Sequence, residues 1–597
     1  MLNKLKHQPW YQWIFLALCA VFLLCLAYTL WTVFYSPVYN DEGQWKLTVS
    51  RLFLDSGYLI NLFPACSEGF LLKSPWTWYP VRILDALIYA DASNPFYLRQ
   101  YGWFIYLGLL ALWSSMCHFC IRLSWGRSLL MVSAFFMVGT MPFLMVWNRP
   151  EQPIMIWITA GLLLGMYFYQ HYPQKTALKV IVFILFALIG CCISASHAKG
   201  VYFLPLFLVL WYRMAKTPWS TIALGTIYLW SFLETLMLWK ARTLCAESEW
   251  WTNMVKSFTI QPKLLITNPH QFFDGGAHNV MRWFDYVNAA SFKIGIYHSY
   301  LVGHPVNSAI DQFALNAVGF SVYVLALLIA INLVQILITS YQQGAKSAVL
   351  TVAVCLLFTV ILFSLNHFSW WGIIALGVTL VFCLLYLLVK KSPSNWVIAL
   401  SLGICLMILM FTQILKNYYE ASLVWPVWLL IGVFTFTVGS TWGRATLKYV
   451  LLPLLLLMAI ASTQLRWDLI GMLPLEWQKT RIERQEDNAK FLVFAKQACG
   501  ITDERSSLVL DDETYPIFWR HPKPMFTAYL YGWYAQGTDY KKTFLLQKPG
   551  GLATNCNSVP LELLPYVKQM KHFCCASQDA IEAFNKKTLK TTHGNVN

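Results

Sequence analysis

Residues 13–34, WIFLALCAVFLLCLAYTLWTVF, form an uncharged apolar run, and residues 35–45, YSPVYNDEGQW, follow it directly. The run is long enough to cross a bilayer as a helix, which needs about 20 residues. Asp41 and Glu42 therefore lie just beyond the end of a predicted membrane helix. Adjacent carboxylates are costly to hold near lipid and usually have a function. The run predicts a membrane fold, and the pair marks the side where chemistry is expected.

The composition extends this prediction to most of the chain. Of the 597 residues, 58% are hydrophobic and 12% are charged, and the mean hydropathy is +0.51. Soluble domains have about 25% charged residues, so a single large soluble core is excluded. We predict about thirteen spans from the apolar runs. They cover residues 13–34, 101–121, 128–147, 153–170, 179–196, 201–213, 219–239, 313–339, 347–366, 371–389, 396–415, 422–440 and 446–465.

The charges orient these spans. If the N-terminus is cytoplasmic and the spans alternate, the inner segments are short and contain no Asp or Glu. They or the adjoining helix ends contain Lys4, Lys6, Arg122, Arg127, Lys175, Lys179, Arg213, Lys216, Lys346, Lys390, Lys391, Arg444 and Lys448. This asymmetry is the positive-inside pattern of membrane proteins. The net charge of +16 is therefore a topology signal. Spread over short loops, it does not indicate nucleic-acid binding.

Two domains follow from this topology. Residues 1–465 are predicted to form the transmembrane domain, with outer loops at 35–100 and 240–312. Residues 466–597 contain no span and are predicted to form a small α+β domain on the outer side. Because the inner loops are short, any chemistry is expected on the outer face.

Shorter elements are predicted within the outer segments. The pattern indicates surface helices at 44–54 and 82–89, a helix within 476–499, strands at 507–511 and 524–531, a helix at 562–571 and a frayed end from 585 to 597. Four cysteines outside the spans lie in the tail: Cys499, Cys556, Cys574 and Cys575. One or two disulfides are expected there, with the connectivity open. Their spacing is not that of a zinc module.

Three further groups of charged residues lie at predicted outer ends of spans. Lys73-Ser74-Pro75 is in the first outer loop, Arg149-Pro150-Glu151 is between the third and fourth spans, and Ser196-His197-Ala198-Lys199-Gly200 follows the fifth. Taken singly, each cation is explained by snorkelling to the interface, and Asp41 by capping of a helix. Together they place acids and cations on one face, as transfer from a phosphate requires: a base for the acceptor and cations for the leaving phosphate.

In order and sidedness, these motifs resemble the GT-C glycosyltransferases, in particular the branch of the lipid A aminoarabinose transferase and the protein O-mannosyltransferases. That branch has an Asp-Glu pair opening the first outer loop, matched by Asp41-Glu42, and a Lys-Gly after the fifth span, matched by Lys199-Gly200. Its Lys-Pro-Pro element corresponds to Lys73-Ser74-Pro75, with Ser replacing one Pro. A late Lys…Tyr…Pro element corresponds to Lys416, Tyr419 and Pro426.

The resemblance implies roles for these positions. Asp41 would be the general base or an acid that orients the acceptor, with Glu42 as its partner or as a metal or acceptor contact. The donor phosphate would bind Lys73, Lys199 and Arg149. The sugar or acceptor would contact Glu151, His197, Lys416 and Tyr419, and Glu151 could instead neutralise Arg149. No cofactor or metal ligand is assigned, and a divalent cation is left open.

The expected activity is inverting glycosyl transfer from a polyprenyl-phosphate-linked sugar to a lipid, glycan or protein acceptor. The expected location is the periplasmic face of a bacterial inner membrane. An oligosaccharyltransferase is an alternative, but Trp250-Trp251-Thr252 lacks the acid of its Trp-Trp-Asp motif. A lipid or solute transporter or flippase is another, although such proteins place ionisable groups at mid-membrane.

Several polar residues remain ambiguous in the sequence. Glu234 is an acid inside a predicted span, with Lys240 or Arg242 as candidate partners. His270, Asp274 and His278 could bind a metal, but turns explain them better. Asp511-Asp512-Glu513 is expected to be a solvated turn.

Overall fold

The structure is a computed structural model of the whole chain. It describes residues 10–34, 58–60, 71–73, 75–89, 98–121, 123–138, 141–146, 151–196, 200, 203–243, 266–269, 308–314, 316–318, 447–471, 479–501, 506–511, 513–519, 523–526 and 548–593, with isolated residues between them. The spans predicted at 347–366, 371–389, 396–415 and 422–440, and most of the span at 313–339, lie outside the described residues.

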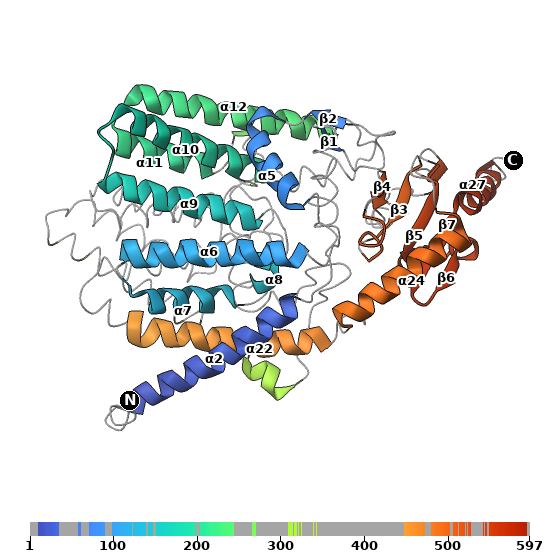
Figure 1. Cartoon of the computed structure of the whole chain (residues 1–597), viewed down its shortest axis with the longest axis horizontal. Helices are drawn as coiled ribbons and strands as arrows, with labels where there is room; N and C mark the ends of the chain where they lie inside the picture. The colour runs from blue at the N-terminus through green and yellow to red at the C-terminus, as the bar shows by residue number, and fades with distance from the viewer. Residues whose placement is uncertain are drawn as a thin grey trace.

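The seven predicted spans before residue 244 all correspond to helices; those from α6 to α12 run side by side, and α2 crosses α22 obliquely (Figure 1). They are α2 (Trp10–Phe34), α6 (Leu98–Ile121), α7 (Trp125–Phe136) with α8 (Met141–Val146), α9 (Glu151–Gln170), α10 (Thr176–Ser196), α11 (Leu204–Ala215) and α12 (Pro218–Thr243). Five helices in the described part of the chain, α2, α6, α9, α10 and α12, are long and apolar enough to cross a membrane. The protein is therefore a helical, polytopic membrane protein.

The third predicted span is interrupted. Helix α7 ends at Phe136, and α8 begins at Met141, next to Pro142. Proline has no amide hydrogen and clashes with the preceding turn, so it ends a helix or starts a new one. The last predicted span is also present, as a short π-helical segment, η6 (Leu447–Leu451), that leads into α22 (Leu452–Gly471). Helix α22 continues past the predicted end at residue 465.

Small residues let the helices approach closely. A Cβ added to Gly161 or Gly165 of α9 would collide with Phe207 or Leu210 of α11, and one added to Gly190 of α10 would collide with Tyr228 of α12. Gly161 and Gly165 thus form a small-xxx-small contact, which is typical of packed membrane helices.

The first outer loop contains a hairpin and two short helices. Strands β1 (Tyr58–Ile60) and β2 (Leu71–Lys73) are antiparallel. The 3-10 helix η2 (Trp76–Trp78) follows and continues into α5 (Tyr79–Tyr89). A helix is therefore present at 82–89, as predicted, although it starts earlier; the helix predicted at 44–54 lies outside the described residues.

The C-terminal residues form a mixed five-stranded sheet of order β4-β3-β5-β7-β6. Its strands are β3 (Leu508–Leu510), β4 (Pro524–Phe526), β5 (Gly551–Asn555), β6 (Lys568–Met570) and β7 (Phe573–Ser577). Strand β3 is parallel to β4 and β5, whereas β7 is antiparallel to β5 and β6. Two short 3-10 helices, η7 (Cys556–Ser558) and η8 (Leu564–Tyr566), lie between β5 and β6.

A helix packs on each face of this sheet. Helix α24 (Arg481–Cys499) shares a core with Phe573 and Cys575, and α27 (Gln578–His593) shares another with Cys574 and Ala576. Successive strand residues point to opposite faces, so the two adjacent cysteines diverge. The four tail cysteines form two disulfides, Cys499–Cys575 and Cys556–Cys574, which confirms the prediction of one or two.

Two predictions for the tail were wrong. Residues 562–571, expected to form one helix, contain η8 and then strand β6. The cause is pairing with β7: Lys568, Gln569 and Met570 oppose Cys575, Cys574 and Phe573. The end was expected to fray from residue 585, but α27 extends to His593, because Ile581 and Phe584 are buried against the sheet and fix the helix that contains them.

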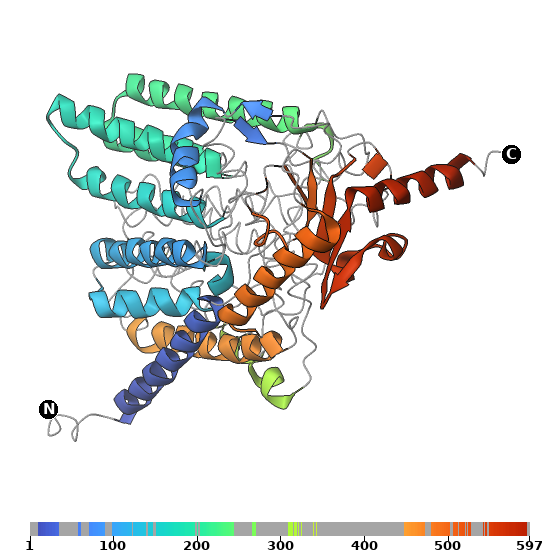
Figure 2. The same ribbon diagram turned by 45° about the vertical axis from the view of Figure 1, so that its right-hand side comes forward.

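The C-terminal sheet lies at one end of the helical bundle (Figures 1 and 2). Ile88 of α5 and Tyr101 and Ile105 of α6 pack against the core that α24 shares with the sheet. We call this the sheet end of the bundle: α6 and α9 begin there, and α10 and α12 end there. The basic turns at 122–127, 171–178 and 214–218 lie at the opposite end of the bundle. The first two follow α6 and α9, and the third leads into α12, as the predicted alternation requires.

Candidate functional site

The side chains of all nine predicted site residues lie outside the described part of the structure. Seven of these residues are not described at all: Asp41, Glu42, Arg149, His197, Lys199, Lys416 and Tyr419. For the other two, Lys73 and Glu151, the backbone is placed, at the end of β2 and the start of α9. The possible metal group His270, Asp274 and His278 is also outside. What the structure describes is the framework next to these positions.

The backbone of Lys73 is positioned by the strand pair β1 and β2 and by the helix η2. Lys73 is the last residue of β2 and pairs with Tyr58 of β1. Three residues later, η2 begins at Trp76, so the backbone of Lys73 is tied to the position of η2.

Helix η2 is bound to α12 through Glu234. Its carboxylate accepts hydrogen bonds from the backbone N–H of Trp76 (3.1 Å), the backbone N–H of Thr77 (2.9 Å) and the Thr77 hydroxyl (2.6 Å). The first N–H groups of a helix have no partner within the helix, so an external carboxylate satisfies them well. The sequence indicated Lys240 or Arg242 as partners; their side chains are outside the described part, and the contact with η2 was missed.

The next residue adds an apolar contact. Trp78 is 3% exposed and packs with Val81, Cys192, Ala195 and Leu238. Its indole Nε1 donates to the Thr235 hydroxyl at 3.3 Å. Burial of an indole ring removes a large apolar surface from water and so contributes strongly to such a contact. The indole N–H then needs a hydrogen-bond acceptor.

Arg82 connects the same segment to α10. Its Nη1 lies 3.3 Å from a carboxylate oxygen of Asp85, and its Nη2 donates to the carbonyl of Ala195 at 3.2 Å. Its guanidinium also lies over the ring of Trp78. Burial lowers the pKa of Arg82, and the charge of Asp85 opposes this. A cation is favourable at the C-terminal end of a helix such as α10, where carbonyls have no partner in the helix.

The predicted Lys199 segment begins at that helix end. Helix α10 ends at Ser196, and Gly200 is the next described residue. A Cβ added at Gly200 would collide with the carbonyl oxygen of Ile193. The chain therefore turns back tightly onto α10 at Gly200, and glycine is required for this close approach.

The Arg149 turn is framed in a similar way. It lies between Val146 of α8 and Glu151 of α9. A Cβ at Gly102 of α6 would collide with the carbonyl of Val146, and the Gln152 amide donates to the carbonyl of Gly102 at 3.2 Å. Both flanks of this turn are therefore held at the N-terminal part of α6, at the sheet end.

Within the predicted solvated turn Asp511-Asp512-Glu513, Asp511 is buried, so the prediction was wrong for this residue; Asp512 lies outside the described residues. Asp511 is 3% exposed, and its carboxylate accepts from the backbone N–H of Thr514 (2.9 Å) and Asn555 (2.6 Å) and from the Thr514 hydroxyl (2.8 Å). Burial raises the pKa of Asp511, while these hydrogen bonds oppose the rise. Asp511 therefore connects the end of β3 to the end of β5.

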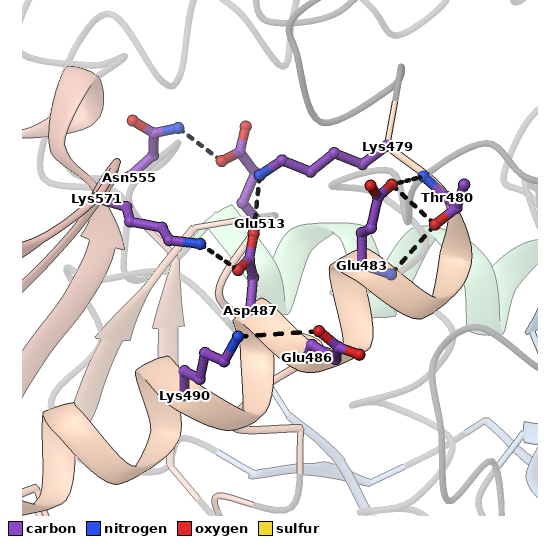
Figure 3. A network of polar contacts seen from close by, with 9 residues as sticks. All are labelled: Lys479, Thr480, Glu483, Glu486, Asp487, Lys490, Glu513, Asn555 and Lys571. Carbon is purple, nitrogen blue, oxygen red and sulfur yellow. Dashed lines mark hydrogen bonds and ion pairs between the residues drawn. The ribbon is translucent and has the colours of Figure 1, made fainter.

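A second carboxylate ties α24 to the sheet. Asp487 of α24 accepts from Lys571 (2.6 Å) and Lys479 (3.1 Å) (Figure 3). The hydrogen bond from Lys571 is the main cause that lowers the pKa of Asp487. The start of α24 is fixed by a capping box between Thr480 and Glu483. These groups satisfy one another. Within the described ranges, no group of three or more His, Cys, Asp or Glu is placed to hold a metal ion.

Comparisons with known proteins give one structural likeness to report. No protein-family model and no curated protein matches the chain. The structure is similar to the crystal structure of ArnT from Cupriavidus metallidurans bound to undecaprenyl phosphate, with a TM-score of 0.36 and 14% sequence identity over 96% of this chain and 98% of that one. A TM-score this low supports no argument about fold or function, so the assignment depends on the chain's own residues.

Proposed function

We propose that this chain is an integral membrane glycosyltransferase of the GT-C type. Its donor would be a sugar on a polyprenyl phosphate, and its acceptor a lipid, a glycan or a protein. The reaction would take place at the sheet end of the bundle, on the periplasmic face of a bacterial inner membrane. Two disulfides in the C-terminal domain support this side, because cytosolic thiols are kept reduced.

The observation that supports the proposal best is the common position of the cation-bearing segments. The strand that contains Lys73 leads into η2, which is bound to α12. Arg82 binds the next helix, α5, to the end of α10. The residues His197-Ala198-Lys199 follow that helix end in the sequence. The turn that contains Arg149 is flanked by contacts to α6 at the same end of the bundle. The described elements that flank these three segments thus lie at one end of the bundle, which supports a shared phosphate site.

In the proposed mechanism, the acceptor hydroxyl gives its proton to the Asp41 carboxylate as its oxygen attacks the anomeric carbon. The new carbon–oxygen bond forms opposite the bond to the phosphate, which breaks and leaves its electron pair on the polyprenyl phosphate. The configuration is inverted. Lys73, Lys199 and Arg149 would stabilise the growing negative charge, and positioning would supply much of the rate.

Purified Asp41→Asn and Lys73→Ala proteins, beside the wild type and a panel of polyprenyl-phosphate sugars, test the proposal. We expect the wild type to consume one donor, Asp41→Asn to bind that donor without turnover, and Lys73→Ala to bind it about tenfold or more weakly. Lys490→Ala, which removes an exposed lysine of α24, is the matched control and should change neither. If no donor binds and the variants alter only stability, Asp41 is a helix cap and the proposal fails.

A further inference from the structure

We infer that Glu234 is a positioning residue for the donor-phosphate site. In this inference, which depends on the proposed function, Glu234 holds the strand that contains Lys73 against the membrane helices. Glu234 does not contact the donor. It acts through η2, which follows Lys73 after Ser74 and Pro75.

Glu234 is unusual for its place in the chain. Among the five candidate spans in the described part, it is the one acidic residue. An ionisable group within a span is costly, and it is usually kept for a function. The contacts of this carboxylate therefore indicate what the function is.

Those contacts all lead to the first outer loop. Both carboxylate oxygens of Glu234 accept hydrogen bonds, one from Trp76 and the other twice from Thr77. A carboxylate with both oxygens used in this way is suited to holding a backbone segment. It is poorly suited to take a proton from an acceptor or to move an ion through the bundle.

The neighbouring contacts fix the direction in which the loop is held. We call the group Trp76, Thr77, Trp78 and Arg82, with the partners Glu234, Thr235 and Ala195, the loop anchor. It joins η2 to α12 through Glu234 and Thr235, and α5 to α10 through Ala195. The segment that contains Lys199 starts just after Ala195. The anchor thus sets the spacing between strand β2, which ends at Lys73, and the C-terminal end of α10, after which Lys199 follows in the sequence.

The geometry also implies how loss of the anchor would affect the reaction. If donor binds only when the strand is anchored, the apparent Kd equals the intrinsic Kd divided by the anchored fraction. Turnover of bound donor should change little, because the cations are in place once donor is bound. A loss of the general base would instead lower kcat. A KM effect without a kcat effect therefore distinguishes positioning from catalysis.

The test compares full-length wild type with Glu234→Gln in lipid nanodiscs. Trypsin cleavage after Lys73, followed by mass spectrometry, reports release of the strand without any donor. We expect the anchored fraction to fall from about nine-tenths or more to about a third, which raises the cleavage rate about tenfold. With undecaprenyl phosphate as probe, we expect the Kd to rise about threefold or more. With a turned-over donor sugar, kcat should stay within about threefold of the wild type.

Two variants serve as comparisons. Glu486→Gln, the same chemical change at an exposed site of α24, should alter neither readout. Thr77→Val removes the shortest of the three hydrogen bonds and leaves the backbone donors in place, so it keeps the test open if Glu234→Gln does not fold. Its effects should have the same direction and be smaller.

The outcomes separate this inference from the proposed function. Faster cleavage with an unchanged Kd would make the anchor purely architectural and overturn the inference. Unchanged cleavage and unchanged Kd would overturn it as well, while the glycosyltransferase proposal stood. A wild type that binds no polyprenyl phosphate would overturn the proposed function and, with it, the role in donor binding, even if the cleavage rate showed that Glu234 holds the strand.

Discussion

Glu234 in helix α12 and Asp511 after strand β3 both accept hydrogen bonds from two backbone N–H groups and one threonine hydroxyl. Their surroundings differ. Glu234 binds a segment 157 residues away, and its contacts are exposed or partly buried. Asp511 binds Thr514, three residues away, and Asn555, and the contacts with Thr514 are buried. Water can replace a lost partner at the first site more easily than at the second.

The difference separates a functional contact from a structural one. Two disulfides link strand β7 of the C-terminal sheet to α24 and to η7, whereas the predicted first outer loop is held to the bundle by non-covalent contacts. We therefore expect changes in the sheet to appear mainly as lost stability. Changes at the loop anchor should appear mainly as altered positioning.

The largest expected effect comes from the disulfides. Cys499→Ser with Cys575→Ser opens a link between residues 76 apart, and Cys556→Ser with Cys574→Ser opens one between residues 18 apart. Loop-closure entropy predicts losses of about 4 and about 3 kcal/mol. Amide hydrogen exchange of β5 and β7 in the full-length protein measures both. An equal or reversed order would show that local strain, not loop length, governs these links.

The second effect compares the two carboxylates directly. Asp511→Ala leaves the buried N–H group of Thr514 and the partly buried N–H group of Asn555 without their acceptor and should destabilise the sheet by about 3 kcal/mol. Glu234→Ala should reduce the protection of η2 by about 2 kcal/mol, less than the loss at Asp511, because water reaches its donors. Hydrogen exchange in β3 and in η2 gives the two values. A larger loss at η2 would contradict the view that the anchor is the weaker site.

Much of this organisation was predictable from local patterns. The spans up to residue 239 and the last span follow from apolar runs, and their alternation follows from where Lys and Arg occur. The pairing partners of the four tail cysteines were left open, because pairing depends on which strands become neighbours. The side chains of Cys574 and Cys575 point to opposite faces because both residues lie in strand β7. This can be inferred only once the strand is known.

The contacts of Glu234 could not be predicted, because they join residues with no pattern in common. An Asp followed three residues later by Thr is a recognisable local motif, yet the expected solvated turn at Asp511 was wrong. The motif was present in the sequence, but the burial of Asp511 depends on Asn555. Pairing of β5 with β3 brings Asn555 next to Asp511. In the same way, residues 562–571 became partly a strand because an edge of β7 was available. Tertiary pairing overrode local preference in each case.

The third effect is a pH dependence in the sheet. The folded pKa of Asp487 is lowered, chiefly by Lys571, below the ordinary value of about 3.9. Its contribution to stability is therefore complete above that ordinary pKa and is lost as the pH falls through the folded pKa. Asp487→Asn should cost about 1–2 kcal/mol at pH 7 and less at pH 3. Amide exchange in α24, corrected for intrinsic rates, measures this. The same loss at both pH values would mean that packing, not charge, is affected.

The smallest effect tests how local the loop anchor is. Thr235 is next to Glu234 on α12 but accepts a single hydrogen bond, 3.3 Å long, from the indole of Trp78. Thr235→Val keeps the shape of the side chain and should cost about 0.5–1 kcal/mol, since a long hydrogen bond contributes little. Trypsin cleavage after Lys73 should then rise about two- to fivefold, less than for Glu234→Gln. If Thr235→Val released the strand as fully as Glu234→Gln, burial of Trp78 would hold the loop. The carboxylate would then add to a contact that the tryptophan already secures.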